Sequence, residues 1–176
     1  PFTLLAQARY LIVKYELPIQ LAAQNISSFP EGAYTGEINA RQIKEFAQYV
    51  IVGHSERKKY LHESEMDIEN KVREAKASDL QVIQCIQDEH SVIHEGVSVV
   101  AYEPPSAIGS GNPDDPEHIK SVFSLVTEER SGLQLLYGGS VNKDSLKGFL
   151  DIEKLSGFLI GGASLEAESF LSLLTW

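Results

Sequence analysis

Four short motifs contain the residue types that transfer protons or bind anions, and each follows a short apolar run. In chain order they are Gly53-His54-Ser55-Glu56-Arg57, Ala101-Tyr102-Glu103-Pro104, Tyr137-Gly138-Gly139-Ser140 and Gly161-Gly162-Ala163-Ser164. A glutamate can remove a proton, and a histidine can stabilise the negative charge that results. Glycine turns leave backbone N–H groups open to a phosphate. A fold that brings the four motifs together would place a His, a Glu and two phosphate-sized turns in one pocket.

The apolar runs before the motifs predict strands that are buried on both faces. They are short, bounded by glycine or charge, and rich in Val, Ile, Leu and aromatic residues. In proteins that alternate strands and helices, functional residues gather at the carboxyl ends of the strands. The pattern predicts an α/β fold with six parallel strands, at residues 19–25, 49–54, 81–86, 97–103, 134–139 and 157–162.

Amphipathic segments between these runs predict the helices that cover the sheet. Apolar residues recur at helical spacing in three segments, one of which is the start of the chain, residues 3–15. In that first segment they are Leu4, Leu5, Ala8, Leu11 and Ile12. In the other two they are Ile68, Val72 and Ala75, and then Ile119, Val122, Phe123 and Val126. Residues 87–96 leave room for little more than one helical turn. One connection between strands is therefore expected to be abbreviated.

Composition indicates one globular domain over residues 1–176. The chain is 43% hydrophobic and has a formal net charge of −10 without a basic stripe, which argues against nucleic acid as a partner. The single cysteine, Cys85, cannot form an internal disulfide, and no signal-peptide or membrane-length apolar segment is present. We therefore expect a cytoplasmic protein that does not insert into a membrane.

In this order, the four motifs resemble those of the triosephosphate isomerase family. Further matching segments extend the similarity over nearly the whole chain; they are Leu21-Ala22-Ala23-Gln24-Asn25, Gly32-Ala33-Tyr34-Thr35-Gly36-Glu37 and Ala107-Ile108-Gly109-Ser110-Gly111. The resemblance implies a TIM (β/α)8 barrel that interconverts dihydroxyacetone phosphate and glyceraldehyde 3-phosphate. It also implies a triose phosphate substrate, no cofactor, no metal, and a homo-oligomer, usually a dimer.

The resemblance assigns roles to individual residues. Glu103 matches the base and His54 the electrophile that stabilises the enediolate, while Ser55 and Glu56 match supporting positions. For the substrate phosphate, the matching positions are Gly109, Ser140, Gly161 and Gly162. The residues agree with these roles, because a carboxylate enclosed by a loop becomes more basic and His54 stands where a strand ends and a helix begins. This family is itself the established example of a glutamate base paired with a neutral imidazole.

The chain also departs from the family pattern. Such barrels typically have about 250 residues, and the match places Pro1 just after the family's second strand, so the Asn-x-Lys element of the first strand has no counterpart. Pro105-Ser106 stands where the family usually has Val-Trp, which stiffens the first hinge of the lid. We therefore expect an incomplete barrel of about six strands with impaired activity.

Three interpretations of the whole chain remain open. It is an isomerase, or a non-catalytic phosphate-binding or assembly protein derived from the same barrel, or Pro1 is an experimental boundary within a longer natural enzyme. Missing strands would expose two sheet edges, which the first helix or another subunit could cover. The loop at residues 32–37, which contains Thr35, is expected at or near such an interface.

Simpler interpretations exist for several residues. Glu103 could be a solvated loop acid, His54 a helix cap, and the glycine pairs tight turns. Cys85 is expected to pack in the core, and His90 and His94 lack a convincing third ligand for a metal. The segment Asp114-Asp115-Pro116-Glu117 is typical of a helix start.

Overall fold

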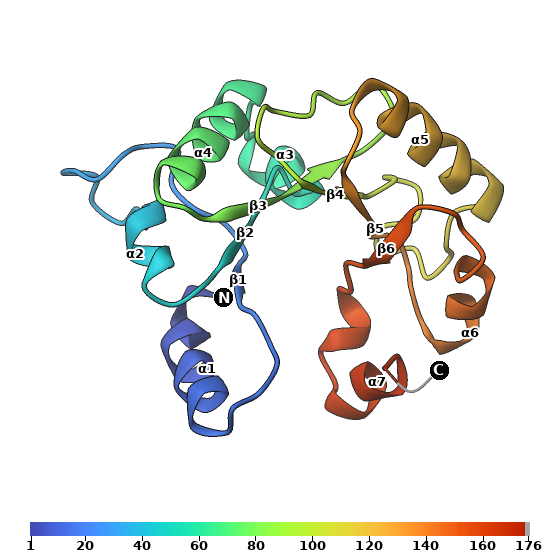
Figure 1. Ribbon diagram of the computed structural model, residues 1–176, viewed down its shortest axis with the longest axis horizontal. Helices are drawn as coiled ribbons and strands as arrows, with labels where there is room; N and C mark the ends of the chain where they lie inside the picture. The colour runs from blue at the N-terminus through green and yellow to red at the C-terminus, as the bar shows by residue number, and fades with distance from the viewer. Residues whose placement is uncertain (175–176) are drawn as a thin grey trace. The chain divides into compact units, whose positions relative to one another are not determined.

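The computed structural model describes residues 1–174 and confirms an α/β fold in which strands alternate with helices (Figure 1). Within that range the strands are β1 (Ala22–Ala23), β2 (Tyr49–Val52), β3 (Gln81–Ile86), β4 (Val99–Tyr102), β5 (Gln134–Tyr137) and β6 (Leu155–Phe158). The α-helices are α1 (Phe2–Lys14), α2 (Ala40–Lys44), α3 (Ser55–Leu61), α4 (Glu65–Ala77), α5 (Pro116–Glu129), α6 (Lys143–Leu146) and α7 (Ala167–Ser172). Two short 3-10 helices are η1 (Lys147–Phe149) and η2 (Gly162–Ser164).

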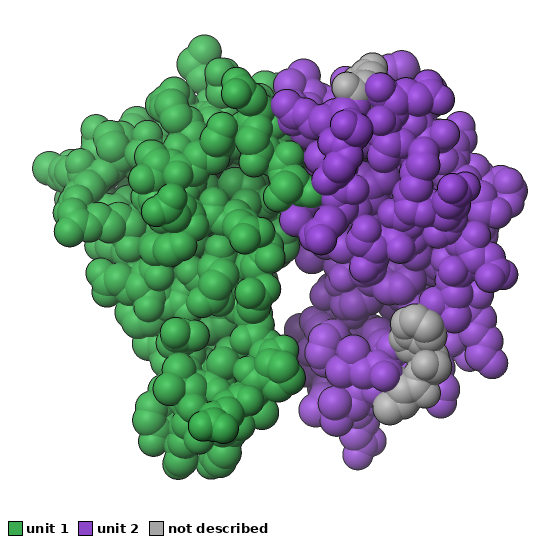
Figure 2. Space-filling view, in the orientation of Figure 1, with its two compact units in different colours: residues 1–84, 94–98 green, residues 85–93, 99–176 purple. Residues whose placement is uncertain are grey.

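The six strands follow one another in the sheet in the order of the sequence, as expected for strand–helix repeats. The pairs β1–β2, β2–β3, β4–β5 and β5–β6 are parallel. The chain divides into two compact units, unit 1 with residues 1–84 and 94–98, and unit 2 with residues 85–93 and 99–176 (Figure 2). Each unit is described separately below. No helix within residues 1–174 is long and apolar enough to cross a membrane.

In unit 1, helix α4 supplies the apolar face that the sequence predicts. Ile68, Val72 and Ala75 are buried, and α4 contacts both β2 and α2. A capping box fixes its start, since the Ser64 hydroxyl accepts the N–H of Asp67 and the Asp67 carboxylate accepts the N–H of Ser64. The Ser64 hydroxyl also donates to the Asp67 carboxylate at 2.6 Å, and this bond together with the one from the Ser64 N–H holds the pKa of Asp67 below its usual value. The helix therefore begins at a defined residue.

In unit 2, an aromatic core lies beneath the strand ends. Tyr137 of β5 contacts Phe149, with ring centroids 5.0 Å apart, and Tyr102 of β4 lies 6.4 Å from Phe123 of α5. Phe123 is buried with the other apolar residues of α5 that the spacing singles out, Ile119, Val122 and Val126. Offset and edge-on ring contacts of this kind add to the energy of burial. The core thereby fixes the ends of β4 and β5, where functional residues follow.

Most predicted elements are present, with different limits at the two ends of the sheet. Strand β3 has the predicted bounds, and β2, β4 and β5 lie within theirs. By contrast, β1 has two residues, and β6 begins and ends earlier than residues 157–162. A register shift between Leu135 and Leu136 accompanies the β5–β6 pairing. Phe158 is the last residue of β6, and the Leu159 N–H still donates to the Tyr137 carbonyl at 3.0 Å.

Two other expectations concern the helices. The first helix is present, but of its predicted apolar face only Leu5 and Ile12 are buried, whereas Leu4 and Leu11 are 52% and 40% exposed. The abbreviated connection is confirmed, because no helix separates β3 from β4. A parallel pair needs a connection of about a dozen residues even without a full helix. Residues 87–98 provide a connection of this length.

A buried ion cluster joins α3, α4 and the segment after β1 in unit 1. The Glu63 carboxylate accepts hydrogen bonds from Arg57 and from the Lys71 ammonium, the latter at 2.6 Å, and Lys71 also donates to the Asn25 side chain at 2.8 Å. The side chains of Glu63 and Lys71 are only 3% and 5% exposed. Burial lowers the pKa of Lys71, and its hydrogen bond to Glu63 acts in the opposite direction. The lysine therefore needs this carboxylate to remain charged.

Replacing Glu63 by glutamine should destabilise the protein strongly. The substitution keeps the size of the side chain and removes the charge that compensates Arg57 and Lys71. Removing one partner of a buried ion pair typically costs about 3–5 kcal/mol. Denaturant unfolding followed by circular dichroism measures this loss in the free energy of unfolding.

The matched control is Glu31→Gln. Glu31 pairs with Arg41 at 2.7 Å, but both side chains are more than half exposed. Exposed pairs contribute about 1 kcal/mol or less. Equal losses for the two variants would contradict the importance assigned to the buried cluster.

Candidate active site

His54 stands between strand β2 and helix α3, as predicted. Gly53 before it has a φ of 73°, which favours glycine, and His54 is the N-cap of α3. Its ring Nδ1 accepts the backbone N–H of Glu56 at 3.3 Å. With Nδ1 acting as an acceptor, a neutral ring carries its proton on Nε2. In this tautomer Nε2–H is the donor of the ring and Nδ1 is committed to the helix cap.

The two supporting residues after His54 differ in burial. Ser55 is buried, with 8% of its surface exposed. The Glu56 side chain is 68% exposed, and its carboxylate lies 3.9 Å from His54 Nδ1. At that distance the carboxylate does not form a hydrogen bond. Glu56 therefore orients the imidazole through its backbone N–H.

Glu103 follows strand β4 and is 2% exposed, so it is not a solvated loop acid. Its backbone N–H donates to the Ile86 carbonyl at 2.8 Å, which extends the sheet pairing by one residue. Gly138 lies against its side chain, because a Cβ at Gly138 would come within 2.8 Å of Glu103 Cγ. The glycine after β5 is therefore needed to give the glutamate its space.

Residues 104–115, the lid, form hydrogen bonds with the turn after β5. The Ser140 hydroxyl donates to the Ala107 carbonyl at 2.5 Å and accepts the Gly111 N–H at 3.1 Å. Ala107 is buried, whereas Gly109 at the tip is exposed and has a φ of 65°. Ser140 was predicted as a phosphate ligand, and its hydroxyl is used to hold the lid. Its backbone N–H is the group to consider for a ligand.

Gly139, like Gly138, allows neighbouring groups to pack closely against the backbone of the turn. A Cβ at this position would collide with the Tyr137 ring and would lie 3.1 Å from Ala107 Cβ. The interpretation of Gly138-Gly139 as a tight turn alone is therefore incomplete, since both glycines make room for neighbouring groups. Each of these groups belongs to the candidate site or to its lid.

Gly161 and Gly162 lie beyond β6 and are exposed. A Cβ at either position would meet no other group within 4 Å, so both backbones border open space. The expected helices after the two glycine turns are short, since α6 has 4 residues and η2 has 3. A helix dipole needs more aligned peptides than these to be strong. Local backbone N–H groups therefore remain the main attraction for an anion.

The predicted site residues fall into both units. His54, Ser55 and Glu56 belong to unit 1, while Glu103, Gly109, Ser140, Gly161 and Gly162 belong to unit 2. Cys85 is buried in β3, as expected for a core residue. No cluster of three or more His, Cys, Asp or Glu side chains suited to a metal occurs within residues 1–174.

One residue of the site region, Asp114, is not predicted by the sequence spacing. Asp114 was interpreted only as part of a helix start, yet its backbone N–H donates to the Tyr137 hydroxyl at 2.8 Å. Because Tyr137 is 23 residues away from Asp114 in the sequence, no local pattern predicts this contact. The tyrosine preceding Gly138-Gly139 was the only available signal.

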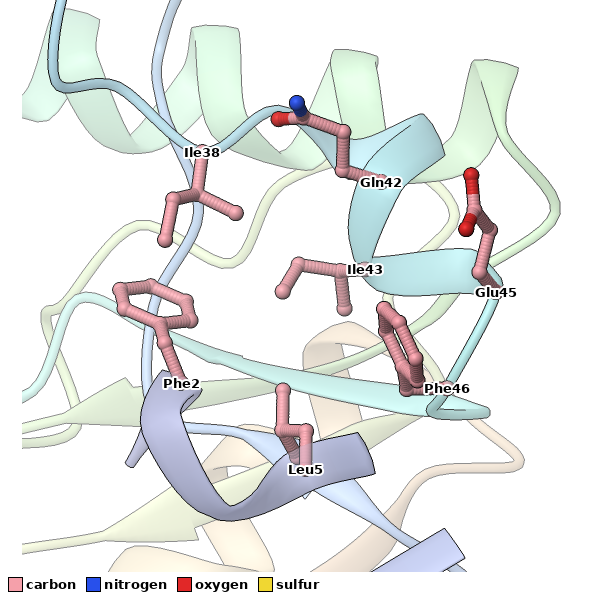
Figure 3. A pocket seen from close by; sticks show the side chains of 7 residues that line it. All are labelled: Phe2, Leu5, Ile38, Gln42, Ile43, Glu45 and Phe46. Atoms are coloured by element: carbon pink, nitrogen blue, oxygen red, sulfur yellow. The ribbon is translucent and has the colours of Figure 1, made fainter. Parts of the chain in front are cut away.

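A hollow in unit 1 is unrelated to this chemistry. It has a volume of about 370 Å³ and lies between α1 and the α2 segment. Figure 3 shows Phe2, Leu5, Ile43 and Phe46 facing it, with Gln42 and Glu45 nearby. None of the predicted site residues lines it. Its lining is mainly apolar and contains no histidine or lysine.

Comparison with known proteins gives a consistent result. The triosephosphate isomerase family profile matches residues 1–176. Triosephosphate isomerase from Mesomycoplasma hyorhinis is 35% identical over 179 residues, covering 89% of this chain and 74% of the relative. The protein of the same name from Alkaliphilus oremlandii is 34% identical over 209 residues, covering 100% of this chain and 84% of the relative. That alignment is longer than this chain, so the relative has internal residues without a counterpart here.

A solved structure extends the similarity to three dimensions. The crystal structure of triosephosphate isomerase from Bartonella henselae superimposes with a TM-score of 0.84 at 29% sequence identity, covering 98% of this chain and 82% of that one. The family profile, the sequence relatives and the solved structure thus point to the same family. This chain belongs to the triosephosphate isomerase family.

Proposed function

We propose that this protein interconverts dihydroxyacetone phosphate and glyceraldehyde 3-phosphate, a step of glycolysis and gluconeogenesis. The observation that carries the proposal is the burial of Glu103 at the end of β4, beside a lid that is hydrogen-bonded to Ser140. A carboxylate withdrawn from water can remove a carbon-bound proton, and a cover prevents water from attacking the intermediate. No cofactor is required for this reaction.

Each step of the reaction has a candidate residue. The Glu103 carboxylate removes the proton from the carbon next to the carbonyl, which leaves an enediolate. His54 donates a hydrogen bond from Nε2 to the oxygen where negative charge develops. The acquired proton then returns from Glu103 to the adjacent carbon, while His54 gives its Nε2 proton to one oxygen of the enediolate and takes the hydroxyl proton of the other. The substrate and product differ only in the position of the carbonyl.

The phosphate of the substrate is assigned to backbone groups of Gly109, Ser140, Gly161 and Gly162. The formal net charge of −10 repels a dianion at long range, so attraction must come from donors close to the phosphate. Backbone N–H groups of glycine turns are suited to this, because no side chain shields them. Exposure of Gly161 and Gly162 agrees with this role.

Two further aspects belong to the proposal. We expect residues 1–176 to act as a single domain in the cytoplasm, with Cys85 reduced. We also expect self-association through the loop at residues 32–37, which is exposed and carries Tyr34 stacked on Phe29, with centroids 4.6 Å apart. A non-catalytic phosphate-binding role is not favoured, since it gives no reason for the burial of Glu103.

Substituting glutamine for Glu103 should abolish most of the activity. The amide keeps the shape of the side chain but cannot accept the carbon-bound proton, so kcat should fall by about 10²–10⁴-fold with little change in KM. A coupled isomerase assay measures both constants. Glu153→Gln is the control, because Glu153 is exposed and lies outside the site. Equal kcat values for the two variants would exclude Glu103 as the base.

Inorganic phosphate should bind at the two glycine turns. Saturating phosphate is expected to shift the amide NMR signals of Gly139, Ser140, Gly161 and Gly162, whereas Gly148 and Gly36 should serve as unaffected glycines. The experiment does not depend on turnover. Unmoved signals at the first four residues would show that the phosphate site is wrongly placed.

Self-association should be detectable by light scattering at micromolar concentration. We expect a mass above that of one 19.5 kDa chain, and a lower mass when Thr35 is replaced by arginine, which adds charge to the proposed contact. Lys143→Glu, on α6, is the surface control. A stable monomer that is insensitive to dilution would refute this part of the proposal.

A further inference from the structure

Asp114, the residue before the N-cap of α5, connects the end of the lid to three other segments. Its carboxylate Oδ2 accepts a hydrogen bond from the Tyr102 hydroxyl at 3.1 Å and lies 2.8 Å from Nδ1 of His118. Its backbone N–H donates to the Tyr137 hydroxyl at 2.8 Å. A single lid residue therefore contacts β4, β5 and α5, all within unit 2.

The two tyrosines make these contacts in a buried environment. Tyr102 is 2% exposed and Tyr137 is fully buried, and the Asp114 side chain is 14% exposed. Burial raises the pKa of both phenols, and the Asp114 carboxylate raises that of Tyr102 further. Both hydroxyls thus stay protonated, and Tyr102 remains a donor to Asp114. A hydrogen bond to a charged group with little access to water is among the stronger ones.

The position of the tyrosines connects these contacts to the candidate site. Tyr102 directly precedes Glu103, and Tyr137 directly precedes the Gly138 that lies against the Glu103 side chain. At the other part of the lid, Ser140 holds Ala107 and Gly111. The lid is therefore attached at two places to the strand ends that carry the base.

The helix start does not explain Asp114. The N-cap of α5 is Asp115, whose carboxylate accepts the N–H of Glu117 at 3.0 Å. Asp114 Oδ1 accepts the N–H of Asp115 at 2.9 Å, while its Oδ2 is the atom that contacts Tyr102 and His118. The His118 ring also lies edge-on to Tyr102, with centroids 6.4 Å apart. Each group in this cluster is thus held by more than one neighbour.

We propose that Asp114 is a positioning residue whose carboxylate, held between Tyr102 and His118, keeps the lid attached beside Glu103. The proposal rests on the isomerase function proposed above for its effect on catalysis. It concerns the end of the lid rather than the reacting atoms. Asp114 is expected to increase the fraction of molecules in which the lid is attached, and the apparent affinity for substrate depends on that fraction.

Asp114→Ala should loosen the lid. The variant loses the carboxylate contacts with Tyr102 and His118, as well as the bond from the Asp115 N–H. The backbone N–H groups of Gly111 and of residue 114 should therefore exchange with solvent deuterium at least about tenfold faster than in the wild type. In the isomerase assay, kcat/KM should fall by about tenfold or more, with contributions from kcat and from KM. Asp114→Asn keeps an acceptor for Tyr102 and should give intermediate values.

The matched control is Asp115→Asn. It removes the same charge from the adjacent residue but retains a good helix cap and leaves Tyr102 and His118 untouched. Thermal unfolding of all variants identifies any that fail to fold, in which case Asp114→Asn carries the test. The control should keep exchange rates and kcat/KM within about twofold of the wild type.

The two measurements separate failure of this inference from failure of the proposed function. Fast exchange in Asp114→Ala combined with an inactive wild type would support the attachment of the lid and refute the isomerase role. An active wild type whose exchange rates and kcat/KM are unchanged by Asp114→Ala would overturn the inference. Equal effects of Asp115→Asn would also overturn it, because they would assign the effect to the helix start.

Discussion

Parallel pairing of short strands is the constraint on which the other features of this protein depend. In a parallel pair, the residues that follow both strands emerge at the same edge of the sheet. In unit 2 this rule brings Glu103 after β4 next to Gly138 after β5, and the backbone bonds from Glu103 to Ile86 and from Gly138 to Tyr102 continue the pairing by one residue. Glu103 and the glycine turn after β5 are therefore positioned by the sheet itself.

Space at this edge of the sheet is limited, and glycines occupy the positions where a side chain would collide with a neighbour. A Cβ at Gly138 would collide with the Glu103 side chain, and a Cβ at Gly139 would collide with the Tyr137 ring and crowd Ala107 of the lid. The same turn supplies Ser140, whose hydroxyl bonds to two backbone groups of the lid. Residues that a sequence motif associates with phosphate thus also determine how the lid is held.

The protein is anionic overall, and the buried charged side chains of Glu63 and Lys71 are paired with close neighbours. With a formal net charge of −10, the protein offers no long-range attraction to a phosphorylated substrate. In unit 1, the buried carboxylate of Glu63 compensates Arg57 and Lys71, so these cations are committed to structure. The His54 ring is in turn oriented by the hydrogen bond that its Nδ1 accepts from the Glu56 N–H.

The sequence was sufficient where a signal is local. Strand β3, the helical face of Ile68, Val72 and Ala75, and the cap at Asp115 follow from periodicity and residue type. His54 and Glu103 were identified because each follows an apolar run, and functional residues gather at the carboxyl ends of strands in such folds. The resemblance to a family assigned their roles. The burial of Glu103 also agrees with the expected exclusion of water.

Features that depend on distant partners were not predicted. The run at residues 158–160 has the composition of a strand, yet β6 spans Leu155–Phe158 and its register with β5 shifts between Leu135 and Leu136. Asp114 has the composition of a helix start, and its bonds to Tyr102 and Tyr137 depend on the tertiary structure. The sequence pattern around Asp114 does not indicate which tyrosine hydroxyls will contact it in the folded protein.

The most direct test of the central claim is deuterium exchange into the substrate. The chain is incubated with dihydroxyacetone phosphate in D₂O, and the label in the recovered triose phosphates is measured by mass spectrometry. Removal and return of a carbon-bound proton by Glu103 predicts deuterium on carbon at a rate proportional to protein concentration and absent after heat inactivation. Recovery of unlabelled substrate from the native protein would contradict the account, because the enediolate would not have formed.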